Sequence, residues 1–116
     1  MKFIYLLIFS FLFSYKGMEL PEIKRNEQII YHNYYTLSYN ETHEQANWVA
    51  YKLTSEQILG RYSRTDDFRI DPKVKTGSAR LSDYKGSGYD RGHLAPAADM
   101  KISKTSMSES FFMSNM

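Results

Sequence analysis

Two short segments in which apolar and polar residues alternate constrain the fold of this chain most strongly. Tyr35, Leu37 and Tyr39 share one face of residues 34–39, and residues 48–53 repeat the alternation. A period of two is typical of a β-strand with one buried face. The segment between them is polar and suits a hairpin loop. We therefore predict an antiparallel hairpin whose tyrosines pack in a core and across strands, rather than forming an exposed aromatic platform.

The rest of the chain predicts little regular structure. Residues 18–33 are mixed and polar and are interpreted as a lead-in, and residues 55–59 fit one helical turn that Gly60 stops. Residues 60–88 have no periodicity and are rich in Gly, Ser, Asp and Arg. A long irregular stretch of this kind inside a compact domain favours a functional loop or a disordered one.

Two further elements are expected near the C-terminal end of the sequence. Residues 103–110 suit a short helix, in which Ser106 and Glu109 have the spacing of a capping box. The apolar run at residues 111–113 is interpreted as the start of a buried strand. Strands followed by short helices indicate an α+β fold.

Residues 1–17 fit a secretory signal peptide. Lys2 precedes residues 3–13, which are apolar apart from Tyr5 and Ser10, and a charged start before a short apolar run is typical of such a peptide. The run is shorter than the roughly 20 residues that span a bilayer as a helix. We expect a secreted or periplasmic protein with no stable membrane anchor beyond this peptide, the alternative being a buried N-terminal helix or strand.

Charge is distributed unevenly along the chain. Beyond residue 17 there are 13 basic and 13 acidic groups, so the net charge alone indicates no partner. Residues 18–60 hold three basic and six acidic groups, whereas residues 61–104 hold ten basic and six acidic groups. A basic face is typical of a phosphate-binding protein, although an ordinary solvated surface explains this surplus equally well. The absence of cysteine excludes disulfides and thiolate metal sites.

His93 stands in an unusual frame, the segment YDRGHLAPAAD at residues 89–99. Small residues around it could leave the imidazole open to a large ligand, and Gly92 permits a close backbone approach or an unusual dihedral angle. An imidazole with an ordinary pKa of about 6.5 can take a proton from water at neutral pH. Asp90 could orient a ligand or a metal-bound water.

Guanidinium groups near this histidine match the geometry of phosphate oxygens. The candidates are Arg91, Arg64, Arg69 and Arg80. A base, an anion clamp and an acidic group together suit phosphodiester hydrolysis. On spacing alone, a chance motif in a loop with a structural histidine remains the alternative.

The segment YDRGHLAPAADM at residues 89–100 resembles the signature of the DNA/RNA non-specific endonucleases. This family includes the endonuclease G-like enzymes and belongs to the His-Me finger, or ββα-metal, group. Ordered matches surround the signature: NWVAYKLT at 47–54, SRTDDFRIDP at 63–72, LSDYKGSGYDRGH at 81–93 and SESFFMSNM at 108–116. The resemblance implies an α+β domain with a ββα-metal core on an antiparallel sheet.

The resemblance also implies roles for individual residues. His93 matches the general base that activates water, and Arg64 matches the arginine that steadies the charge of the phosphate. Asp90 matches an acid near the waters of the metal. Arg91 is expected to be structural or to clamp the nucleic-acid backbone, and Asn115 matches a position in the wall of the site.

The family holds a divalent ion, Mg²⁺ (or Mn²⁺), mainly through an asparagine about nine residues beyond the Ser114–Asn115 pair. That position lies beyond Met116, so we expect residues 18–116 to be the N-terminal part of the domain, with an incomplete core and no main metal ligand. The implied substrates are DNA and RNA, cleaved without strong sequence preference, and a homodimer is left open. The alternative is a truncated, catalytically inactive fragment that binds nucleic acid in a salt-sensitive manner.

Overall fold

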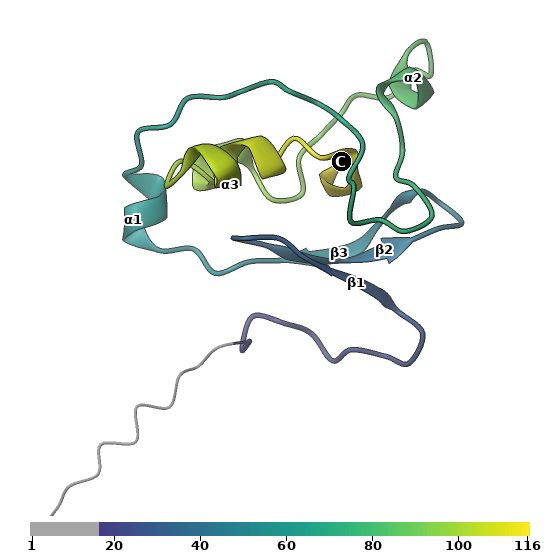
Figure 1. The fold of residues 1–116 in the computed structure, drawn as a ribbon, viewed down its shortest axis with the longest axis horizontal. Helices are drawn as coiled ribbons and strands as arrows, with labels where there is room; N and C mark the ends of the chain where they lie inside the picture. The colour runs from purple at the N-terminus through teal and green to yellow at the C-terminus, as the bar shows by residue number, and fades with distance from the viewer. Residues whose placement is uncertain (1–16) are drawn as a thin grey trace, which may run out of the picture.

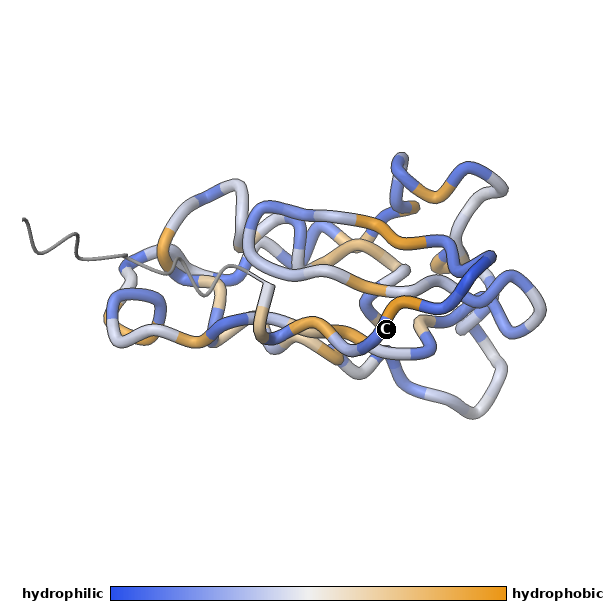
Figure 2. The backbone as a smooth tube through the Cα atoms, turned by 90° about the horizontal axis from the view of Figure 1, so that it is seen from below, coloured by the Kyte–Doolittle hydropathy of each residue, from blue (hydrophilic) through white to orange (hydrophobic). Residues whose placement is uncertain are grey.

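A computed structural model describes residues 17–116 of the chain. The expected signal peptide at residues 1–17 therefore lies outside the described residues except for its last position. Orange, hydrophobic stretches of the described backbone are short and alternate with hydrophilic ones (Figure 2). Within residues 17–116, no helix combines the length and the apolar character that crossing a membrane requires.

A three-stranded antiparallel sheet forms the base of the fold, with the strand order β1-β2-β3 (Figure 1). The predicted hairpin is confirmed: β2 spans Thr36–Asn40 and β3 spans Gln45–Ala50. The strand β3 ends three residues before the predicted limit at residue 53. The lead-in interpretation of residues 18–33 is wrong in part, because β1 spans Gln28–Tyr31 and pairs with β2. So short an edge strand depends on its neighbour's hydrogen bonds, and four residues carry too little periodicity to reveal it.

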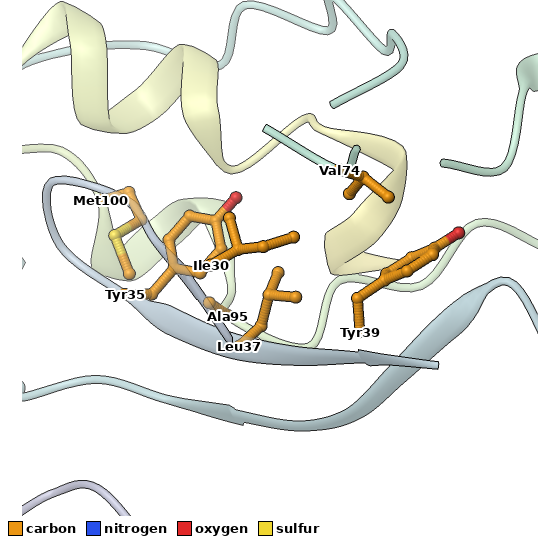
Figure 3. Close-up of a cluster of buried hydrophobic side chains, with 7 residues drawn as sticks. All are labelled: Ile30, Tyr35, Leu37, Tyr39, Val74, Ala95 and Met100. Atoms are coloured by element: carbon orange, nitrogen blue, oxygen red, sulfur yellow. The ribbon is translucent and has the colours of Figure 1, made fainter. Parts of the chain in front are cut away.

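The alternating tyrosine face packs in the core, as predicted. Tyr35, Leu37 and Tyr39 are all almost fully buried. They join residues that arrive from other segments in one apolar cluster (Figure 3): Ile30, Val74, Ala95 and Met100. This cluster attaches the loop after residue 60 and the signature segment to the sheet.

Short helices and turns lie over the face of the sheet that carries this core (Figure 1). The elements are α1 at Ser55–Ile58, α2 at Leu81–Tyr84, α3 at Lys104–Glu109, and the 3-10 turns η1 at Ala97–Asp99 and η2 at Met113–Asn115. The predicted helical turn after residue 54 is confirmed as α1, and the predicted helix at 103–110 as α3. The stretch 60–88 is irregular as predicted, except for α2.

Two details of the C-terminal prediction need correction. The capping box of α3 joins Ser103 to Ser106, not Ser106 to Glu109, because the helix begins one turn earlier. Residues 111–113 are buried as predicted but do not start a strand. Phe112 forms an isolated parallel bridge with Arg69, after which the chain turns into η2.

Gly60 fixes the start of the long irregular segment. A Cβ atom at this position would clash with the backbone carbonyl group of Lys101. Tyr62 donates its backbone N–H to the same carbonyl at 3.3 Å. A glycine is therefore required here because the backbone passes directly against the turn that leads to α3.

Candidate active site

Three segments that are far apart in the sequence meet beside the sheet. The backbone N–H of Arg69 donates to the carbonyl oxygen of Phe111 at 3.3 Å, and Met113 donates to that of Arg69 at 2.8 Å. Leu94 donates to the carbonyl oxygen of Asn115 at 2.8 Å. Backbone hydrogen bonds thus place the Arg64–Asp71 region, the signature and the C-terminal turn side by side.

Asn115 fixes the backbone directly after His93. Its side chain is fully buried, its Oδ1 atom accepts from the backbone N–H of Ala95 at 2.8 Å, and its Nδ2 atom donates to the carbonyl oxygens of Ala95 and Ser110 at 3.0 and 2.9 Å. The residue expected in the site wall therefore lies behind the histidine as a backbone clamp.

His93 lies in an aromatic corner and is half-buried. The centroid of its ring is 4.7 Å from that of Phe111 and 5.8 Å from that of Phe68, both edge-on. The two phenylalanine rings contact each other at 4.9 Å. Its Nε2 atom has no hydrogen-bond partner among the described residues. The Nδ1 atom of His32 and the Nε2 atom of Gln57 are also buried without a partner there. Most buried polar atoms are hydrogen-bonded, so each such atom needs an explanation, and for His93 a catalytic role is one.

The electrostatics of the site favour the neutral imidazole. Burial lowers the pKa of His93 below its ordinary value, the nearby Arg64 lowers it further, and Asp66 acts in the opposite direction. The net lowering keeps the ring unprotonated at neutral pH. A neutral ring can present a lone pair to a proton, as a general base must.

The two predicted phosphate-binding arginines flank this corner. The Cζ atom of Arg64 lies 5.0 Å from the ring centroid of Phe111, and that of Arg91 lies 4.2 Å from the centroid of Phe68. Both residues are exposed. Arg64 also forms a solvent-exposed ion pair with Asp66 at 3.1 Å. Each guanidinium thus stacks on a ring that contacts His93.

The other candidate arginines are placed differently. Arg69 donates to the carboxylate of Asp67 at 2.8 Å and to the carbonyl oxygen of Ser108 at 3.0 Å, so it holds α3 in place. Arg80 is the residue before α2, and its backbone N–H donates to the carboxylate of Asp83 at 2.7 Å. Neither contacts the ring of His93.

Asp90 and Gly92 lie on the open side of the signature. Asp90 is exposed and lines the hollows on both sides of residue 89. The expected unusual dihedral angle at Gly92 is wrong, since its φ is not positive, whereas the expected close approach of a ligand to this backbone stays a prediction, and a Cβ atom there would meet nothing within 4 Å. The space in front of the backbone at this position is open.

The described residues do not form a metal centre by themselves. Across residues 17–116, no group of three or more His, Asp or Glu side chains converges in a way that could hold a metal ion. These residues therefore do not fit a complete divalent-cation site. The chemistry that their own side chains offer is proton transfer and the binding of an anion.

The sequence did not single out the residues that support the site. Phe68 and Phe111 build the aromatic corner, and a phenylalanine in each flanking motif was the only signal. His32 is buried, and its Nε2 atom lies 2.7 Å from the Oδ2 atom of Asp71. Ser114 donates to the same oxygen at 2.6 Å, which ties β1 to η2.

Asp71 is the centre of that buried network. Burial would raise the pKa of its carboxyl group, but hydrogen bonds from His32 and Ser114 more than offset this and hold the pKa below its ordinary value. The backbone N–H of Asp71 also donates to the hydroxyl oxygen of Ser78 at 2.8 Å. The carboxylate is thus a structural anion that joins three segments.

The antiparallel sheet, the short helices over it and the histidine after a strand-free loop define an α+β fold with a partial ββα-metal nuclease core. The chain belongs to the DNA/RNA non-specific endonuclease family, whose model matches residues 17–116. The nuclease of Nostoc sp. is 44% identical over 102 residues, which cover 86% of this chain and 37% of that protein. The family is generally dependent on a divalent metal.

Animal proteins and a solved structure give the same relationship. The mitochondrial nuclease EXOG of Danio rerio is 43% identical over 84% of this chain and 28% of its own length. Human mitochondrial endonuclease G is 40% identical over 71% of this chain and 28% of its own length. A crystal structure of the EndoG/EndoGI complex superposes with a TM-score of 0.74 at 28% identity, covering 86% of this chain and 43% of that chain. The chain thus spans well under half of each of these proteins.

Proposed function

We propose that this chain carries the proton-accepting half of a nuclease active site, with His93 as the general base. The observation that carries this proposal is the buried, unpartnered Nε2 atom of a half-buried histidine, whose neighbouring rings Phe111 and Phe68 each carry a stacked arginine. The lowered pKa of His93 supports this proposal, because the ring is then neutral at neutral pH and can accept a proton. General bases of this kind contribute about 10²- to 10⁴-fold to the rate.

In this proposal a water molecule gives its proton to His93 while its oxygen bonds to phosphorus. The bond from phosphorus to the 3′ oxygen breaks, and this oxygen takes up a proton to leave as a hydroxyl, so the products carry a 5′-phosphate and a 3′-hydroxyl. Arg64 and Arg91 hold the non-bridging oxygens, since guanidinium groups match phosphate geometry. The phosphate would replace Asp66 on Arg64.

The substrates proposed are DNA and RNA, cleaved without strong sequence preference. Contacts to phosphate position a nucleic acid but carry no sequence information, and Arg64 and Arg91 suit such contacts. Mg²⁺ or Mn²⁺ is proposed on the ground of the family alone, with Asp90 near the waters of the ion. When bound, the ion would offset charge on the phosphate.

A plasmid-nicking assay with Mg²⁺ tests the proposal on three proteins. These are this chain, a version extended through the family's next helix, and the extended version with His93→Ala. We expect nicking by the extended protein and a loss of at least about 100-fold on His93→Ala. Undiminished nicking by the folded variant would refute the role of His93. If this chain and the extended version both bind the plasmid but neither nicks it, the inactive nucleic-acid-binding alternative is favoured.

We also propose that the protein is secreted or periplasmic. The apolar run at residues 3–13 after Lys2 supports this. Sequencing the N-terminus of protein recovered from outside the cytoplasm tests it. A start near residue 18 is expected, whereas an intact Met1 would contradict the proposal.

A further inference from the structure

A hollow beside the candidate active site has Phe68 and Arg91 in its lining. Its volume is about 670 Å³, within the range of about 300 to 1,000 Å³ typical of small-molecule sites. Aromatic, apolar and basic side chains line it: Phe68, Leu81, Tyr84, Lys85, Tyr89 and Arg91. Asp90 is also on its rim, so the two cations leave a net positive charge.

Tyr89 is the unusual member of this set. Its exposed fraction is 79%, whereas Tyr35 and Tyr39 are exposed by 2% and 3%. No aromatic partner stacks on its ring within the described residues. It follows a loop in which Gly86 and Gly88 have φ values of 73° and 84°, a left-handed conformation that glycine adopts without strain. The loop thus leaves a large exposed ring in the lining of this hollow and of the neighbouring one.

The hollow is adjacent to the proposed reaction centre. Phe68 is its shared wall, because this ring contacts His93 at 5.8 Å and lines the hollow. Arg91 stacks on the same ring at 4.2 Å and lines the hollow as well. Because the two sites share Phe68 and Arg91, a strand with one phosphate at His93 can continue into the hollow.

We infer that this hollow is a subsite for one nucleobase of a single strand, stacked on Tyr89, with Lys85 on the phosphate of that nucleotide and Arg91 on the scissile phosphate beside it. The inference rests on the proposed function, because it concerns the same substrate. Aromatic side chains stack on any of the bases, so such a subsite adds affinity without sequence preference. Charge and ring chemistry together favour a nucleotide over an apolar peptide segment.

Binding of a single-stranded DNA hexamer, measured in EDTA by fluorescence anisotropy, tests the inference without any cleavage. A second hexamer lacks its bases but retains every sugar and phosphate. We expect the full chain to bind the normal hexamer about tenfold more tightly than the abasic one. Tyr89→Ala should remove this difference, and Tyr89→Phe should keep it. Tyr31→Ala is the matched control, because Tyr31 is 54% exposed but lies on the edge strand β1.

Equal affinity for the two hexamers would overturn the inference, as would a base-dependent difference that survives in folded Tyr89→Ala. The same titration on the version extended through the next helix tests whether the hollow is instead a packing surface. A Tyr89 effect that vanishes there would assign the hollow to packing within a longer polypeptide. Nicking and base-dependent binding are independent readouts. If His93 proves not to be the base, the test of the hollow still stands, and if the hollow binds no base, the test of His93 still stands.

Discussion

Asn115 offers the sharpest test of how the fold holds the histidine. Replacing it with alanine removes three side-chain hydrogen bonds, two to Ala95 and one to Ser110. Each such bond contributes about 1 kcal/mol net, and buried groups left unpaired cost at least as much. We therefore expect Asn115→Ala to lower the free energy of unfolding by about 3 kcal/mol, a large fraction of the roughly 5–15 kcal/mol typical of a domain.

Urea unfolding followed by tryptophan fluorescence of Trp48 measures this loss. The comparison variant is Asn47→Ala, whose exposed side chain accepts from Nδ2 of Asn40 at 2.9 Å and donates to Oγ of Ser38 at 3.4 Å, so that its loss should cost no more than about 1 kcal/mol. An Asn115→Ala protein that unfolds at the same urea concentration as wild type would refute the clamp. So would a loss no larger than that of the comparison variant.

Three further predictions follow from other contacts of the structure. Gly60→Ala should destabilise by about 1 to 3 kcal/mol because its Cβ meets backbone, whereas Gly92→Ala should be neutral in the same urea assay. Asp71 has a lowered pKa, so it adds stability above pH about 4 that is lost as the pH falls through the folded-state value. Asp71→Asn should thus have a lower free energy of unfolding than wild type at pH 7, and this free energy should fall less between pH 4 and pH 2. The same fall as in wild type would contradict this. Arg64→Ala should raise the pKa of His93 in an NMR titration, since a nearby positive charge is removed, and an unshifted titration would exclude that coupling.

The local elements of the fold were predictable where periodicity or capping carried the signal. The alternation at Tyr35, Leu37 and Tyr39 predicted both β2 and its buried face. The helical turn at residues 55–59 was predicted from Gly60, which follows it, and the capping box of Thr54 and Gln57 that begins α1 did not enter the prediction. By contrast, β1 and the bridge of Phe112 depend on partners distant in sequence, which no local pattern records.

The sequence predicts the chemistry of the site, which the assays proposed above would test, but it did not predict which residues support the site. The frame of His93 and the nearby arginines indicated a base and an anion clamp. The aromatic corner of Phe68 and Phe111 and the network of His32 with Asp71 were not predictable, because they are made by tertiary contacts. Such residues look like ordinary core or surface positions until the fold brings them together.

The pH dependence of the reaction tests the central claim most directly. NMR of the free extended protein, assigned with His93→Gln, gives the pKa of the His93 ring, and the acid limb of kcat/KM reports the pKa of the essential base in the free enzyme. We predict that the two coincide below the ordinary histidine value of about 6.5. A rate that stays constant while the ring of His93 takes up its proton would contradict the account.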